Sequence, residues 1–420
     1  MSTFAIVSSY SESCGNASFT RVLHDSIRHY SNASVEVIEL DLKLLQSTNK
    51  IIREKGHRHI SEIASRLKAF DGVNIQFEAG LYGTLPSDII RRATILMQAN
   101  PNTTVTLHSP RLMEASSASA RAGIRKLVTL QIVDGLREII GNKLADIHIR
   151  INRKVIKNAI KNNLRLIVHT SRAARQIQQF FNYTRVDVHP LKIVPDNFER
   201  DGSVLERIRS EISLTESDVL LGMFGYISAY KGHGDALKAL SLLPKEYKLL
   251  IFGRQHPQTL KVDGKTDAYL QKLIETVLAN KSLRGRVFFL GELEDNDFWK
   301  VASAVDVAWL PYYENGQDGS GIASICMDAC QRVLCSSSFA FDELFKLVPY
   351  DNYMRFDIGN YLEIATKTEM LMRRDLSGHP EKPVTSVYNC QTQAVVYARD
   401  LPNFLVNLDP QTQGFKQAAQ

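Results

Sequence analysis

The feature that most constrains the fold of this chain is a regular alternation of short apolar runs with amphipathic helical stretches. Such alternation is typical of parallel sheets covered by helices. The expected strands are Phe4–Ser8, Val35–Leu40, Val73–Gln76, Thr104–His108, Leu164–His169 and Lys192–Pro195, then Val219–Phe224, Tyr247–Phe252, Val287–Leu290, Val305–Leu310 and Val333–Ser336. The expected helices include Ser18–Tyr30, Ser87–Ala99, His233–Leu243, Ala268–Leu278, Asp297–Ala304, Gly321–Cys330 and Tyr388–Ala398. The pattern predicts two consecutive doubly wound, Rossmann-like α/β units.

The length of 420 residues also favours two domains, because one hydrophobic core rarely grows beyond about 250–300 residues. A charged and polar segment at Phe198–Ser217 is the expected linker. We therefore expect domains at residues 1–200 and 201–385, followed at 386–420 by a closing helix, which returns towards the N-terminal domain, and a tail.

Charge is distributed unevenly along the chain. Residues 1–200 carry 28 Lys and Arg against 17 Asp and Glu, whereas residues 201–420 carry 23 against 28. A basic half suggests an anionic partner such as a phospholipid surface, although such cations also simply solvate helix faces. The segment Asn152–Asn163 fits either reading. Nucleic-acid binding is disfavoured, because aromatic residues do not interleave with the charge.

The cysteines and the N-terminus favour a cytoplasmic protein. Five cysteines, an odd number without zinc-ligand spacing, suggest reduced thiols. The apolar run at Phe4–Ser8 has no basic flank, so it reads as a strand and not as a secretory signal. No segment approaches the roughly 20 apolar residues that span a bilayer.

Three loops lie where an expected strand meets an expected helix, the usual place for anionic ligands in such sheets. The first is Ser11–Ser18, with Gly15 and Asn16; it lacks the full Gly-x-Gly-x-x-Gly pattern of nicotinamide enzymes. The second, Phe224–His233, contains Lys231 at the start of a helix, where an ammonium group suits a diphosphate. An exposed surface lysine is the alternative.

The third loop, Leu310–Gly321, is acidic and rich in glycine. Its carboxylates could hold sugar hydroxyls and its amides phosphate, or Asp318 and Ser320 only cap the next helix. Glu294–Asp297 is interpreted as a helix cap, because no Asp-x-Asp metal motif is found. A metal-independent reaction without a bound cofactor is therefore expected.

Several segments together resemble the retaining glycosyltransferases of family 4 (glycosyl transferases group 1). These are Gly225–Gly232, Leu249–Gly253, Val287–Leu293 and Ala304–Pro311, and in the N-terminal half Val73–Gly83 and Val105–Ser109. The resemblance implies two Rossmann-like domains facing a cleft (GT-B), with an acceptor-binding N-terminal domain and a donor-binding C-terminal domain. It implies transfer of a sugar from a UDP- or GDP-sugar to an acceptor hydroxyl with retention, as in polysaccharide or glycolipid assembly.

The same resemblance assigns expected roles to residues. Lys231 would bind the donor diphosphate, His108 would lie at the donor sugar, and Glu314 and Asp318 would act with them at the reacting centre. Gly15 and Asn16 would approach the diphosphate from the N-terminal domain. The remaining donor contacts would come from Gly225, Tyr226, Gly253, Arg254, Glu292, Leu293, Gly319, Ser320, Gly321 and Ile322.

Two positions depart from the family pattern. Tyr226 replaces an arginine that usually contacts the diphosphate, and Cys326 occupies the place of a second glutamate that usually binds ribose. Asp328 is two residues away from that place. A non-catalytic nucleotide-sugar-binding subunit and a nucleotide-sugar epimerase or phosphorylase on the same fold are therefore the alternatives, although no acid–base pair for an epimerase is found.

Overall fold

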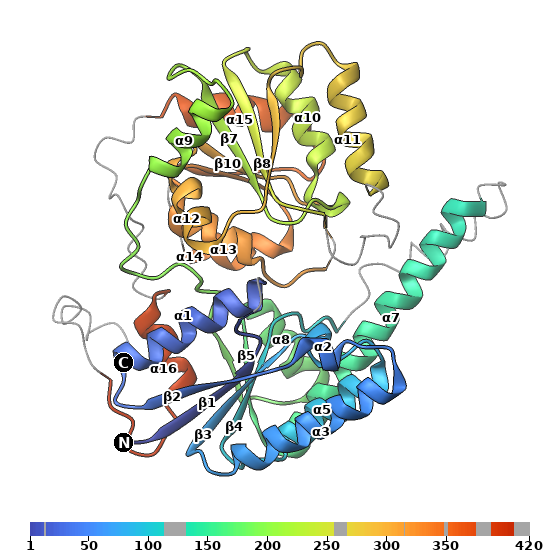
Figure 1. Cartoon of the computed structure of the whole chain (residues 1–420), viewed down its shortest axis with the longest axis vertical. Coiled ribbons are helices and arrows are strands. Elements are labelled where there is room, and N and C mark those ends of the chain that lie inside the picture. Colours follow the sequence, from blue (N-terminus) through green and yellow to red (C-terminus); the bar gives the residue numbers. More distant parts are fainter. Residues whose placement is uncertain are drawn as a thin grey trace. The chain divides into compact units, whose positions relative to one another are not determined.

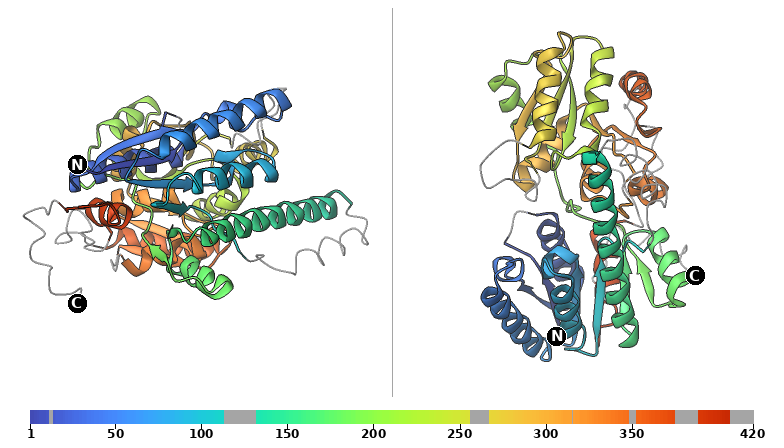
Figure 2. Two further views of the ribbon diagram at one scale, coloured as in Figure 1. Left: turned by 90° about the horizontal axis from the view of Figure 1, so that it is seen from below. Right: turned by 90° about the vertical axis from the view of Figure 1, so that its right-hand side faces the viewer.

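The computed structural model describes residues 1–11, 14–112, 132–255, 267–314, 316–347, 352–374 and 388–406. The chain forms two compact units, one of Met1–Lys192 with Tyr388–Gln420 and one of Ile193–Val387. The divisions fall at 192/193 and 387/388, where 200/201 and 385/386 were expected. The two units are called the first and the second unit below, and each is described by itself (Figures 1 and 2).

The first unit is built on a six-stranded parallel sheet of order β2-β1-β3-β4-β5-β6. The strands are β1 (Thr3–Ser8), β2 (Ser34–Glu39), β3 (Gly72–Phe77), β4 (Thr103–Leu107), β5 (Arg165–Val168) and β6 (Val186–Val188). Its described helices are α1 (Gly15–Tyr30), α2 (Leu42–Leu45), α3 (Lys50–Leu67), α4 (Ala79–Tyr82), α5 (Pro86–Met97), α7 (Ile132–Lys161), α8 (Ser171–Phe181) and α16 (Cys390–Ala398).

The two faces of this sheet differ in chemistry, because side chains alternate along each strand. One face is apolar and packs against α3, α5, α7 and α8. The other face carries buried polar side chains on its central strands, including Asn74, Gln76, Thr104 and Thr106. Helices α1 and α16, which pack against each other, cover this second face. The C-terminal helix therefore completes the first unit.

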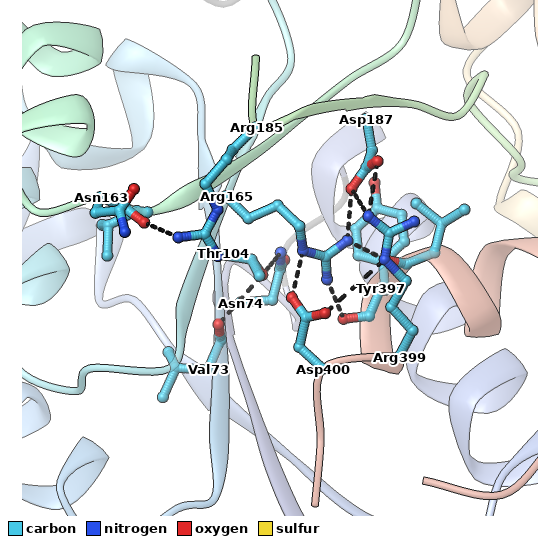
Figure 3. A network of polar contacts seen from close by, with 12 residues as sticks. Val73, Asn74, Thr104, Asn163, Arg165, Arg185, Asp187, Tyr397, Arg399 and Asp400 are labelled. Carbon is cyan, nitrogen blue, oxygen red and sulfur yellow. Dashed lines mark hydrogen bonds and ion pairs between the residues drawn. The ribbon is translucent and has the colours of Figure 1, made fainter. Parts of the chain in front are cut away.

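A charged network fastens α16 to the sheet (Figure 3). Arg165 on β5 is buried, and its Nη1 donates to Asp187 Oδ2 at 2.7 Å and to the carbonyl oxygen of Val396 at 2.6 Å. Its Nε also forms a 2.7 Å ion pair with Asp400. Arg399 donates to both carboxylate oxygens of Asp187. A buried guanidinium is stable only when paired in this way.

The second unit has its own six-stranded parallel sheet, of order β12-β11-β10-β7-β8-β9. Its strands are β7 (Val219–Phe224), β8 (Tyr247–Phe252), β9 (Val287–Gly291), β10 (Val307–Leu310), β11 (Val333–Ser336) and β12 (Tyr353–Phe356). Its described helices are α9 (Ser203–Glu211), α10 (His233–Leu242), α11 (Ala268–Ala279), α12 (Asp295–Ala304), α13 (Gly321–Ala329), α14 (Asp342–Leu347) and α15 (Tyr361–Met372), with single turns η1 (Ala229–Lys231) and η3 (Phe339–Phe341).

The core of this unit explains why its strands read as continuous apolar runs. Alternate residues of β7, β8 and β10 pack against α10, α11 and α15, and Trp309 on β10 is 1% exposed. Its indole nitrogen donates to Thr368 Oγ1 at 2.9 Å. Both faces of the sheet are covered, as is usual for parallel sheets.

Two expectations about the chain were wrong. Lys192–Pro195 is not a strand; the last strand of the first sheet is β6, and no described residue between 189 and 195 has regular structure. The expected linker at 198–217 contains α9, which packs against α12 in the second unit. Pro190 and Pro195 explain the first error, since they produce an extended chain that cannot pair along a ladder.

Candidate functional site

Each sheet has one point where the strand order reverses. In the second unit β7 and β10 are neighbours although they are far apart in sequence, and in the first unit β1 and β3 are. Crevices at the carboxyl ends of such strands are where open α/β sheets bind ligands. The loops after β7 and β10, at residues 225–232 and 311–320, lie at this point in the second unit.

These two loops are in direct contact. The backbone nitrogen of Tyr313 donates to the carbonyl oxygen of Tyr230 at 2.7 Å. Gly232 has φ +72°, and a Cβ there would collide with the carbonyl oxygen of Pro311. Glycine is therefore needed at position 232 on both conformational and steric grounds.

Lys231 is the central side chain of the site. It ends η1 and is 4% exposed, and its Nζ donates to the carbonyl oxygen of Phe224 at 2.8 Å. The same Nζ lies 5.5 Å from the ring centroid of Tyr312. Burial lowers the pKa of Lys231 to about 7, while the thiol of Cys326 acts in the opposite direction. Among the described residues, no carboxylate forms an ion pair with this ammonium group.

The first glycine of the motif makes room for that ammonium group. Gly225 has φ +82°, and a Cβ there would overlap Lys231 Nζ and come within 3.0 Å of Ile322 on α13. Cys326 is one helical turn beyond Ile322 and fully buried. The thiol of Cys326 is near enough to the Lys231 ammonium group to favour its charged form.

The loops after β7 and β10 lead into helices α10 and α13, and both helices begin near Lys231. Gly321 is the first residue of α13, and Ser320 caps it by accepting from the nitrogen of Ala323 at 3.2 Å. Ser320 therefore caps α13, which is one of the two roles that the sequence suggests for it. The buried Oγ of Ser228 has no hydrogen-bond partner among the described residues. A buried polar atom needs a hydrogen-bond partner, and in a binding loop a ligand atom can supply it.

The two carboxylates of the third loop, Glu314 and Asp318, differ in their surroundings. Glu314 Oε1 accepts from the nitrogen of Gly316 at 2.7 Å, and its Oε2 accepts from Ser338 Oγ and from the nitrogen of Phe339. Glu314 thus ties its loop to η3. Asp318 is 3% exposed. Of the other third-loop positions, Gly319 is half-buried, and Asn315 lies outside the described residues.

The turn after β8 is pressed against the loop after β7. A Cβ at Gly253 would collide with the carbonyl oxygen of Gly225, and Arg254 accepts through its backbone oxygen from the nitrogen of Ile227. The Arg254 guanidinium lies 5.8 Å from the Tyr226 ring, and its Nε pairs with Glu292 at 3.0 Å. Glu292 and Leu293 follow β9.

The remaining expected site residues belong to the first unit. Gly15 and Asn16 begin α1, next to Glu12 and Ser13, which lie outside the described residues. His108 follows β4, and its two ring nitrogens contact Gln76 and His169 at 2.7 Å and 3.1 Å. Burial lowers the pKa of His108 well below its usual value.

Sequence reasoning missed the partners of His108. His169 and His189 are both buried, and burial lowers the pKa of His169 to about 4 and that of His189 to about 3. A signal was present in the sequence, because two neighbouring expected strands, Thr104–His108 and Leu164–His169, both end in histidine. Parallel neighbours bring such ends together.

Comparisons with known proteins agree with this architecture. The structure is similar to sucrose-phosphate synthase of Thermosynechococcus elongatus (TM-score 0.64, 14% identity, covering 95% of this chain and 98% of that one). It is similar to Anabaena HepE in complex with UDP and glucose (TM-score 0.58, 13% identity, covering 94% and 95%). It also resembles WaaG, a glycosyltransferase involved in lipopolysaccharide biosynthesis (TM-score 0.55, 14% identity, covering 94% and 99%). No curated protein sequence matches significantly.

The sequence comparison with families points in the same direction. The model of the family described as "Glycosyl transferases group 1" matches residues 205–345, which include the loops after β7 and β10. Two parallel six-stranded sheets, each flanked by helices, are the architecture of the GT-B structures above. The structure therefore has the GT-B fold, and residues 205–345 of the chain match the glycosyl transferases group 1 family.

Proposed function

We propose that this protein transfers a sugar from a nucleoside-diphosphate sugar to an acceptor hydroxyl with retention of configuration. The observation that carries the proposal is the environment of Lys231. A buried ammonium group is costly unless it is paired, yet the described residues offer it a backbone carbonyl, an aromatic ring and the thiol of Cys326, and no carboxylate. A diphosphate bound there would supply the missing negative charge.

The proposal gives parts of the reaction to particular groups. Cleavage of the sugar–phosphate bond leaves negative charge on the diphosphate, and fixed positive charge at that place lowers the barrier. Lys231 and the amides that begin α13 at Gly321 would provide it, with Ser228 Oγ as a further donor. Glu292, Leu293 and Arg254 would contact the nucleoside, because they follow the neighbouring strands β8 and β9.

Donor binding tests the proposal directly. Thermal unfolding is measured with a panel of UDP- and GDP-sugars, since a ligand of the folded state raises the midpoint. Lys231→Ala should abolish the stabilisation and lower turnover by orders of magnitude. Lys238→Ala is the matched control, because Lys238 is on α10 but exposed and paired with Asp235. Equal donor binding by Lys231→Ala would refute the role of Lys231, and analysis of the product anomer tests retention.

One observation favours a second candidate, a subunit that binds nucleotide sugars without transferring them. Cys326 is fully buried where the resemblance implies a glutamate that contacts ribose, so this position offers no carboxylate. Tight donor binding together with no release of nucleoside diphosphate, with or without acceptors, would favour this candidate over the enzyme.

We further propose that the acceptor is presented at an anionic membrane surface on the cytoplasmic side. Residues 147–186 contain nine Lys and Arg and no Asp or Glu. On α7, the exposed Arg150, Lys154, Lys157 and Lys161 follow one another at helical spacing, and the opposite face is buried. Each such cation near an anionic surface contributes about 1 kcal/mol. No described helix is both long and apolar enough to cross a membrane.

Vesicle binding tests this part of the proposal. The protein is sedimented with vesicles of phosphatidylcholine alone or with added phosphatidylglycerol. Binding should need the anionic lipid and should be lost on replacing Lys154, Lys157 and Lys161 with Glu. Replacement of the exposed Lys245, Lys272 and Lys281 of the second unit is the matched control. Vesicle binding that neither set of lysine substitutions reduces would contradict the proposal.

A further inference from the structure

A chain of polar side chains crosses the first unit beneath α1. It runs from Thr106 through Asn74 and Gln76 to His108 and His169. At its end, His169 Nδ1 lies 2.9 Å from the carbonyl oxygen of His189. Phe19 of α1 packs edge-on against both histidine rings, with centroids 5.3 Å and 5.6 Å away.

The proton positions in this chain follow from one backbone carbonyl. A carbonyl oxygen only accepts, so His169 Nδ1 must carry a proton. If His169 is neutral, its Nε2 has no proton and must accept from His108 Nδ1, 3.1 Å away. If His108 is also neutral, its Nε2 must accept in turn. The amide NH₂ of Gln76 must then face it. In the structure Gln76 Oε1 lies 2.7 Å from His108 Nε2 and Gln76 Nε2 faces Asn74 Oδ1, so this direction requires the amides of Gln76 and Asn74 to be turned by 180°.

The opposite direction of the chain requires an additional proton. If the Gln76 oxygen faces His108, then His108 Nε2 donates to it and Nδ1 accepts from His169. His169 would then donate from both nitrogens and would be an imidazolium. Burial opposes such a charge, and no described carboxylate acts on either ring to offset it. The neutral direction, in contrast, leaves every member with a partner.

We propose that His169 is a positioning residue that holds His108 as a neutral imidazole with its proton on Nδ1. His108 then has both ring nitrogens bonded within the first unit. Its contribution to sugar transfer, which rests on the function proposed above, is a fixed ring and backbone at the end of β4. It does not exchange a proton with the substrate.

Nitrogen NMR on the wild-type protein tests the proposal without a substrate. The protein is labelled with ¹⁵N-histidine and the resonances are assigned with single His→Gln variants. We expect a protonated Nδ1 and an unprotonated Nε2 for both His108 and His169 between pH 6 and 8. A protonated Nε2 on either ring, or an imidazolium, would overturn the proposal.

Variants add a prediction that a merely structural role does not make. Gln76→Glu places a carboxylate, which only accepts, opposite His108 Nε2. His108 should then be protonated on both nitrogens near neutral pH. His189→Phe is the matched control, because it removes a buried imidazole but keeps the carbonyl that orients His169. This variant should leave the tautomers of His108 and His169 unchanged. A changed tautomer in His189→Phe would contradict the proposal that the carbonyl oxygen of His189 sets the proton positions.

The kinetic consequence is measured with nucleotide-sugar hydrolysis. His169→Phe should lower kcat by about tenfold to a hundredfold through misplacement of the His108 ring, while affinity for UDP and the pH profile remain unchanged. An ionisation in the pH profile of the wild-type enzyme that is absent from the profile of His108→Gln would refute the assignment of His108 as a neutral imidazole. If no donor binds the wild-type protein, the proposed function fails, whereas the NMR result still decides the protonation of His108.

Discussion

Binding of a nucleotide sugar should take up a proton at alkaline pH, because Lys231 is buried without an anionic partner. With a pKa of about 7, only about one free site in eleven is protonated at pH 8. The diphosphate favours the charged form and should return the pKa towards the ordinary lysine value of about 10.4. The structure therefore predicts uptake of about 0.9 proton per bound donor at pH 8, and affinity that falls about tenfold per pH unit above that.

Isothermal titration calorimetry measures this uptake. Titrations of UDP- or GDP-sugar at pH 8 are repeated in buffers of different ionisation enthalpy, and the dependence of the observed enthalpy on the buffer gives the number of protons. Both phosphates of the ligand are esterified, so the ligand itself does not titrate here. Lys238→Ala should behave like the wild type. Tight binding by the wild type with uptake below about 0.2 proton would refute the reasoning.

Three further predictions concern the two units. Arg165→Met should destabilise the protein by about 2–3 kcal/mol in urea unfolding, because Asp187 and the carbonyl oxygen of Val396 lose a buried charged donor; Arg399→Met, 45% exposed at that side chain, should cost only about 1 kcal/mol or less. Equal losses would contradict the network. Lowering the pH from 7.5 to 5 should cost about 2 kcal/mol for each of His169 and His189, because their folded-state pKa values of about 4 and about 3 lie below the unfolded value of about 6.5. The unfolded state alone then binds protons, so stability falls as pH drops through 6.5 towards 4, and a flat urea-unfolding profile would refute this. Gly225→Ala should weaken donor binding at least about tenfold, as judged by calorimetry, through strain at φ +82° and displacement of Lys231. Gly234→Ala, with open space around it, should bind normally and gain up to about 1 kcal/mol.

The sequence predicts the strands of the second unit well, because buried parallel strands are continuous apolar runs. Tyr247–Phe252 and Val333–Ser336 form strands with the expected bounds. Edge strands are harder. β12 (Tyr353–Phe356) carries a half-buried arginine, and β6 (Val186–Val188) has three residues around Asp187. Short, partly polar strands owe their pairing to the neighbouring strand, and a local pattern does not contain that information.

The sequence predicts the position of the candidate site in the chain, but it does not predict the directions of the side chains there. Glycine spacing around Lys231 marks a strand–loop–helix junction, which the structure contains. The direction of Glu314 depends on Ser338, which is distant in sequence, and the partners of His108 come from two other strands. Such contacts depend on tertiary packing, so residue type and spacing alone do not predict them.

The return of α16 to the first unit has a consequence for biosynthesis. The second unit is one uninterrupted segment, Ile193–Val387, whereas the first is assembled from both ends of the chain. During translation the later segment can therefore mature first, while the earlier one lacks α16, so that the side of α1 that packs on α16 is uncovered and Arg165 lacks Asp400 and the carbonyl oxygen of Val396 as partners. A ribosome-stalled chain ending near residue 387 should consequently bind chaperones through its amino-terminal part.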